Sequence, residues 1–95
     1  MKIWVDDLRQ PTNDWFWLKT SAETIAYLEY VKATGGVDTI THMSLDHDLG
    51  GDDTTRPIVL WMCENDIWPV EITVHSANPV GIEWLEGMIE RYKNW

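Results

Sequence analysis

The sequence predicts one α/β domain, spanning residues 1–95, with a mostly parallel sheet. Short apolar runs alternate with longer segments of helical periodicity, and this alternation is typical of right-handed crossovers between parallel strands. The chain has 95 residues, of which 44% are hydrophobic and seven are Trp. That length and composition favour a single dense core.

The first half of the chain predicts two strands before any helix. Residues 2–5 are an apolar run that stops at two aspartates, and residues 15–18 are continuously aromatic and apolar. The intervening residues 8–14 are rich in turn formers, so we expect a loop there. A helix is then predicted from Ser21, with Ser21 or Thr20 as its N-cap.

The second half repeats the alternation of strand and helix. A glycine pair ends the first helix, and a third strand is predicted near residues 39–45. Pro57 fits the first turn of a second helix, which Pro69 stops. Residues 71–74 predict the fourth strand, and a last helix begins after Asn78. In parallel sheets of this kind, ligands bind outside the carboxyl ends of the strands.

Charge and cysteine usage exclude several functions. The formal net charge is −9, which disfavours non-specific binding to DNA or RNA. Cys63 is the only cysteine, so an intramolecular disulfide and a thiolate metal cluster are excluded. No apolar run approaches the length of a membrane span, and no signal-peptide pattern is present. We therefore expect a cytoplasmic protein with no membrane partner.

Titratable side chains follow three of the four predicted strands. Carboxylates from separate strands repel one another unless a cation lies between them. Oxygen-rich sites of this kind suit Mg²⁺, with Mn²⁺ as the alternative. The expected metal ligands are Asp6, Asp7 and Asp46.

The candidate catalytic residues are His47, His75, Asp46 and Asp48. Histidine titrates near neutral pH, so His47 and His75 could share the roles of base and acid at a phosphorus centre. Alternatively, the two imidazoles could complete a transition-metal site together with the carboxylates.

Donors for a phosphate group are expected near the same edge. Arg9 follows the first acidic pair and could clamp a phosphate in a bidentate fashion. Ser76 and the N-terminus of the last helix, around Asn78 and Gly81, supply hydroxyl and backbone N–H donors. Ordinary helix capping by Asn78 is compatible with this role.

Three segments of the chain resemble the signatures of the cyclic-phosphate-processing receiver domain family, a divergent branch of the response-regulator receiver fold. They are the sequences DDLR at 6–9, SLDHDLG at 44–50 and VHSANPVG at 74–81. The resemblance implies a flavodoxin-like, receiver-like three-layer domain with a four-stranded parallel sheet of order 2-1-3-4. Relative to ordinary receivers, the first helix and the fifth strand are absent.

The resemblance also implies residue roles. Asp6 and Asp7 match the acidic pair that binds Mg²⁺ in receivers, Asp46 matches the phospho-accepting aspartate, and Ser76 matches the hydroxyl residue after strand four. The departures are histidines at positions 47 and 75 and the absence of the lysine that follows a fifth strand.

These features lead to three hypotheses. The first is metal-assisted hydrolysis of a cyclic phosphate, on a cyclic nucleotide or a 2′,3′-cyclic phosphate end of RNA. The second is a non-catalytic protein that sequesters a cyclic nucleotide. The third is a pseudo-receiver that contacts another protein through its acidic face. The expected partner is a small phosphorylated ligand or an RNA end, and homo-oligomers and protein partners stay open.

Overall fold

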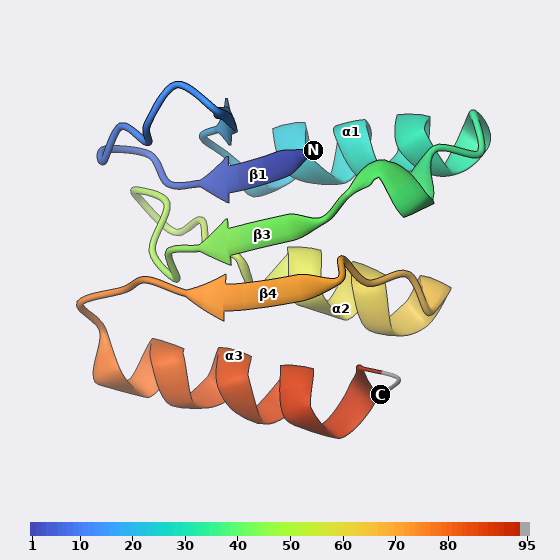
Figure 1. Cartoon of the computed structure of the whole chain (residues 1–95). Coiled ribbons are helices and arrows are strands. Elements are labelled where there is room, and N and C mark those ends of the chain that lie inside the picture. The colour runs from blue at the N-terminus through green and yellow to red at the C-terminus, as the bar shows by residue number, and fades with distance from the viewer. Residues whose placement is uncertain (94–95) are drawn as a thin grey trace.

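In the computed structural model, which describes residues 1–93, four parallel strands form one sheet with the order β2-β1-β3-β4 (Figure 1). The strands are β1 (Lys2–Val5), β2 (Trp15–Leu18), β3 (His42–Leu45) and β4 (Glu71–Val74). The helices are α1 (Ser21–Ala33), the 3₁₀ turn η1 (Val37–Thr39), α2 (Arg56–Asn65) and α3 (Pro79–Tyr92). This order confirms the receiver-like α/β fold.

Most predicted boundaries agree with the structure, and two details differ. The third strand begins at His42, three residues later than predicted, because residues 37–39 form η1. The N-cap of α1 is Thr20, whose Oγ1 accepts a hydrogen bond from Glu23 N at 3.0 Å. Ser21 is the first residue of α1, and its hydroxyl donates to Asp53 at 2.5 Å.

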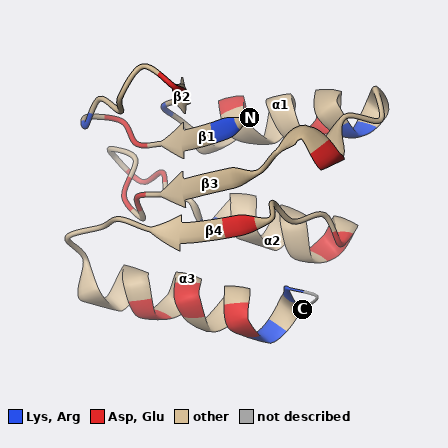
Figure 2. Ribbon diagram, in the orientation of Figure 1, with Lys and Arg blue, Asp and Glu red and all other residues tan. Residues whose placement is uncertain are grey.

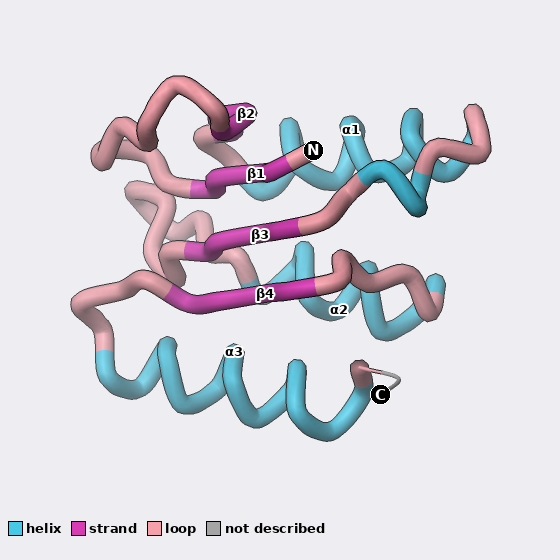
Figure 3. The backbone as a smooth tube through the Cα atoms, in the orientation of Figure 1, coloured by secondary structure: helices cyan, strands magenta, loops and turns pink. Residues whose placement is uncertain are grey.

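The helices and the sheet share one apolar core, and the tube view separates the helical layer from the strands (Figure 3). Alternate strand residues, such as Ile3 and Val5, point into this core, where they meet Leu28 of α1, Met62 of α2 and Leu85 of α3. The described residues therefore form two layers, not the three that were predicted. The loop between β1 and β2 stands where a helix would cover the opposite face.

Aromatic side chains pack across that uncovered face of the sheet. Trp4 stacks on His75 with ring centres 3.9 Å apart and an interplanar angle of 14°. Trp15 meets Trp4 edge-on at 5.6 Å, and it meets His42 edge-on at 6.5 Å. Each of these four side chains is half-buried. Lateral packing of the rings thus shields the backbone where no helix does so.

Acidic residues gather beyond the carboxyl ends of β1 and β3 and along α3, whereas basic residues are few and scattered (Figure 2). No helix of the described chain is long and apolar enough to span a bilayer.

The packing on the uncovered face predicts a stability effect. Replacing Trp4 by Ala removes its stacking on His75 and its contact with Trp15, and should lower the free energy of unfolding by about 2–3 kcal/mol. Urea denaturation measures the change. Tyr30→Ala is the matched control, because that ring is 63% exposed on α1 and its loss should cost under about 0.5 kcal/mol. Equal losses in the two variants would contradict the packing.

Candidate functional site

The ladder of backbone hydrogen bonds continues one residue beyond the strands. The backbone N–H of Asp6 bonds to β2 at 3.1 Å, that of Asp46 to β1 at 2.9 Å, and that of His75 to β3 at 2.8 Å. These three residues therefore occupy consecutive positions along one edge of the sheet. Their convergence follows the rule that the carboxyl ends of parallel strands share an edge.

Asp6, Asp7 and Asp46 form an acidic cluster at this edge. One carboxylate oxygen from each residue lies within 4.8 Å of those from the other two. Asp6 is fully buried, and the other two are half-buried. Three like charges at this separation repel one another unless a cation offsets them. The donor set of carboxylate oxygens fits a hard divalent cation such as Mg²⁺ or Mn²⁺.

The carboxylate of Asp6 is held by hydrogen bonds from two sides. Its Oδ1 accepts from the backbone N–H groups of Leu8 and Arg9, both at 2.9 Å, and its Oδ2 lies 3.0 Å from Nε2 of His75. Burial raises the pKa of Asp6, but the hydrogen bonds from Arg9, Leu8 and His75 outweigh it, so the pKa lies below the ordinary value. Asp6 is therefore an ionised, fixed carboxylate.

His75 lies beside Asp6 on the uncovered face of the sheet, and its side chain is 16% exposed. Its Nδ1 is 2.7 Å from the hydroxyl of Ser44, which accepts a hydrogen bond from Thr73 Oγ1 at 3.2 Å. The carboxylate of Asp6 at Nε2 favours the tautomer that carries its proton there, so that Nδ1 accepts from Ser44. Trp4 covers one face of the ring. Both ring nitrogens thus have protein partners, and the geometry suits a residue that orients Asp6.

The loop after β3 closes over the acidic cluster at Gly50. This glycine has a φ of +89°, and a Cβ atom there would lie 2.9 Å from Oδ2 of Asp7. The positive φ and the close approach both favour glycine. The carboxylate of Asp7 is thereby kept beside the loop that carries Asp48.

A cavity of about 270 Å³ opens at this edge. It is lined by Asp7, Leu8, Arg9, Asp46, Asp48, Gly50, Ser76 and Ala77. Five of the predicted site residues therefore share one cavity: Asp7, Arg9, Asp46, Asp48 and Ser76. Asp6 lies next to it through the acidic cluster.

The N-terminus of α3 is occupied by its own cap. Asn78 Oδ1 accepts from Gly81 N at 3.0 Å, and Asn78 N donates to the hydroxyl of Ser76 at 3.2 Å. Neither Asn78 nor Gly81 lines the cavity. Of the three phosphate-binding residues predicted between β4 and the first turn of α3, Ser76 lines the cavity.

Asp48 connects the cavity wall to α3. Its carboxylate accepts a hydrogen bond from the side chain of Asn78 at 3.1 Å and lies 3.0 Å from Nδ1 of His47. These two hydrogen bonds, the first being the stronger influence, lower the pKa of Asp48 below the ordinary range. Asp48 therefore adds a further negative charge to the cavity wall.

His47 points away from the cavity, into the space beneath α3. Its side chain is 6% exposed. Arg56 Nε donates to Nε2 of the ring at 2.9 Å, so the ring proton is on Nδ1 and is donated to Asp48. A Cβ atom at Gly81 would lie 2.3 Å from His47 Cγ. The structure therefore separates His47 from His75, and His47 supports Asp48 and α3.

Sequence reasoning missed the residues behind His75. Trp4, Ser44 and Thr73 each precede a strand-end residue by two positions, and therefore share its face of the sheet. The period-two alternation along the strands was the available signal.

The parallel sheet and the carboxylates at the ends of β1 and β3 define a receiver-like α/β domain with an acidic site at its strand ends. The family model of the cyclic-phosphate processing Receiver domain matches residues 1–91, and the chain belongs to this family. No curated protein and no solved structure gave a match.

The contact between α3 and His47 predicts that Gly81 is intolerant of any side chain. Gly81→Ala should lower the free energy of unfolding by at least about 1–3 kcal/mol, because the new methyl group overlaps the imidazole. Gly87→Ala in the same helix is the control. No atom lies within 4 Å of its added Cβ, so it should stabilise the fold by about 0.5–1 kcal/mol. Thermal denaturation that ranks the two variants in the opposite order would refute the contact.

The lowered pKa of Asp6 predicts a pH-dependent stability. Its ionised form stabilises the folded state above the ordinary pKa of 3.8, and this contribution is lost as the pH falls through the lower folded value. In metal-free buffer, Asp6→Asn should therefore be less stable than the wild type at pH 7. The deficit should shrink as the solution is acidified. Urea denaturation at several pH values measures the difference in free energy of unfolding between the two proteins. A difference that stays constant with pH would contradict a stabilising role of the ionised Asp6 carboxylate.

Proposed function

We propose that the chain hydrolyses a P–O bond of a cyclic phosphate in the cavity at the strand ends, with the help of a divalent cation. The single observation that carries this proposal is the acidic cluster of Asp6, Asp7 and Asp46 at a cavity that Arg9 and Ser76 also line. Membership of a family described as processing cyclic phosphates supports the substrate class.

Asp6, Asp7 and Asp46 would hold the cation, which would act on a phosphoryl oxygen as a Lewis acid. Arg9 would contact the phosphate through its guanidinium, and the hydroxyl of Ser76 would donate to a second oxygen. The positive charges of the cation and of Arg9 are needed to attract a phosphodiester, because the other charged groups of this cavity are carboxylates.

Hydrolysis forms one bond from water oxygen to phosphorus and breaks one ring P–O bond. The water loses a proton, and the departing ring oxygen gains one. We assign the role of general base to Asp48 and not to an imidazole. Asp48 lies on the cavity wall, and its carboxylate keeps lone pairs that could accept the proton of the water. Bulk water supplies the proton to the departing oxygen. His75 acts through Asp6 as a positioning residue, because hydrogen bonds behind a ligand tune its orientation.

A second candidate is binding without cleavage, with the protein sequestering a cyclic nucleotide. The specific observation in its favour is that His47 and His75 both have their ring nitrogens paired with protein groups. Neither imidazole lines the cavity, so neither can act there as a general acid that protonates the departing oxygen.

The test combines metal binding with turnover. Calorimetric titration with Mn²⁺ should give one site, and Asp46→Asn should weaken it by at least roughly tenfold. Asp52→Asn, the same change at an exposed loop aspartate outside the cavity, should leave it intact. Incubation with 2′,3′- and 3′,5′-cyclic nucleotides in the presence of Mg²⁺ or Mn²⁺, followed by ³¹P NMR, should show a monoester product in the wild type.

The outcomes separate the candidates. Tight binding of a cyclic nucleotide that is recovered intact favours sequestration. The absence of both binding and turnover with every cyclic phosphate refutes hydrolysis and sequestration alike.

His75→Ala should weaken Mn²⁺ binding by roughly 10–100-fold, and His75→Gln, which keeps an N–H donor for Asp6, should restore part of the loss. Unchanged Mn²⁺ affinity in His75→Ala would contradict the positioning role.

A further inference from the structure

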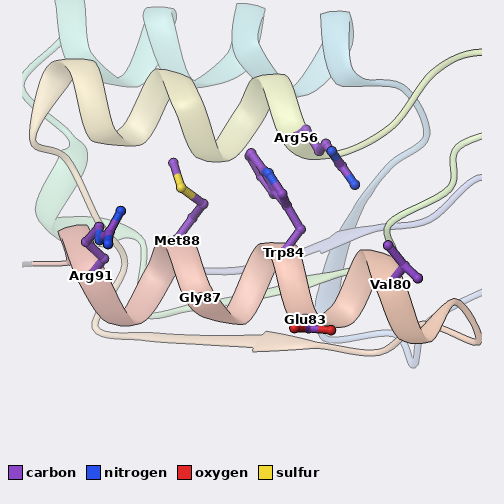
Figure 4. Close-up of a pocket in the computed structure, with 7 residues that line it drawn as sticks. All are labelled: Arg56, Val80, Glu83, Trp84, Gly87, Met88 and Arg91. Carbon is purple, nitrogen blue, oxygen red and sulfur yellow. The ribbon is translucent and has the colours of Figure 1, made fainter.

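A second cavity lies on the helical layer, away from the strand ends. It is a groove of about 500 Å³ between α3 and the start of α2, and Trp84 and Met88 point from α3 toward α2 within it (Figure 4). Arg56 and Arg91 flank these apolar side chains at the two ends. Both lie in a chain that has seven basic residues against 16 acidic ones. The groove is thus a basic and apolar surface on an acidic protein.

Neither arginine of the groove is part of an ion pair in the part of the chain that the structure describes. Glu83 also borders the groove, but its side chain points away from α2 in Figure 4. Charge complementarity therefore favours a ligand that brings its own carboxylates.

Arg56 is held ready for such a contact. Its Nε donates to His47 at 2.9 Å, and its guanidinium carbon lies 4.7 Å from the centre of the Trp84 ring. These contacts fix the side chain and leave its terminal N–H groups for a carboxylate. A side chain that is already ordered loses less entropy on binding.

The shape of the groove selects the class of ligand. Its side chains form a row along α3 (Figure 4). Trp84 and Arg91 are about two helical turns apart in the sequence, which corresponds to about 10 Å along the helix axis. A row of anchors at this spacing is typical of grooves that receive an amphipathic helix. Because the guanidinium carbon of Arg56 lies 4.7 Å from the centre of the Trp84 ring, carboxylates at positions i and i+7 of such a helix would lie near Arg56 and Arg91, with apolar residues at i+3 and i+4 between them.

We propose that the groove between α2 and α3 is a docking site for an acidic, amphipathic helix of a partner protein. Arg56 and Arg91 contact its carboxylates, and Trp84 and Met88 contact its apolar side chains. This site is separate from the acidic cavity, so it stands whether or not the chain hydrolyses cyclic phosphates.

The test uses a synthetic helical peptide with Glu at i and i+7 and Leu at i+3 and i+4, capped at both ends and labelled for fluorescence anisotropy. The full chain should bind it saturably, and binding should weaken as salt is added. A peptide with Lys in place of both Glu should not bind. The absence of saturable binding to the acidic peptide, or equal binding of both peptides, would overturn the proposal.

Gly87 provides the sharpest variants, because it borders the groove and a Cβ atom there meets nothing within 4 Å. Gly87→Glu should weaken binding roughly tenfold, and Gly87→Lys should strengthen it, since the two side chains differ mainly in charge. Lys32→Glu on α1, which lies outside the groove, should leave the affinity unchanged. Equal effects of Gly87→Glu and Gly87→Lys, or binding of a single-stranded oligonucleotide in place of the peptide, would refute a site for acidic protein segments.

Discussion

A buried negative charge organises the edge of the sheet where the candidate site lies. The carboxylate of Asp6 is fully buried, and such a group is tolerated only when hydrogen bonds replace its water. The amides of Leu8 and Arg9 supply two of these bonds, which fixes the start of the loop between β1 and β2. His75 supplies another and is itself held by Ser44. The positions of Arg9 and of the acidic cluster follow from this one requirement.

A second constraint is steric and ties α3 to the loop after β3. The ring of His47 occupies the space that a side chain at position 81 would need. The first turn of α3 can therefore pack against this ring only if residue 81 is glycine. Asn78 caps the helix through Gly81 and also donates to Asp48. Two contacts therefore position the cavity wall and α3 together. One is the packing of His47 against Gly81, and the other is the hydrogen bond from Asn78 to Asp48.

Much of this arrangement was accessible from the sequence. Abrupt changes from apolar to acidic residues located the strand ends, and the strand-end rule then placed Asp6, Asp46 and Ser76 at one edge. The directions of the two histidines depend on which face of the sheet the helices cover, as well as on the alternation along each strand. Residues on a strand alternate between faces, so His47 follows Leu45 toward the helical layer, whereas His75 shares the open face with Thr73. The missing third layer has a different origin: a loop replaces the helix between β1 and β2, and the path of a loop is not fixed by periodicity.

His47 links the two cavities of opposite charge through its hydrogen bonds, because Asp48 lines the acidic cavity and Arg56 lines the groove between α2 and α3. Its neutral ring carries one proton, which is donated to Asp48 on the acidic side, while its other nitrogen accepts from Arg56 on the basic side. If Arg56 and Asp48 met directly, they would neutralise each other as an ion pair. By standing between them, the imidazole satisfies one hydrogen bond of each group in place of a direct ion pair. An acidic chain thereby retains, close to its own carboxylates, a guanidinium that forms no ion pair with Asp48.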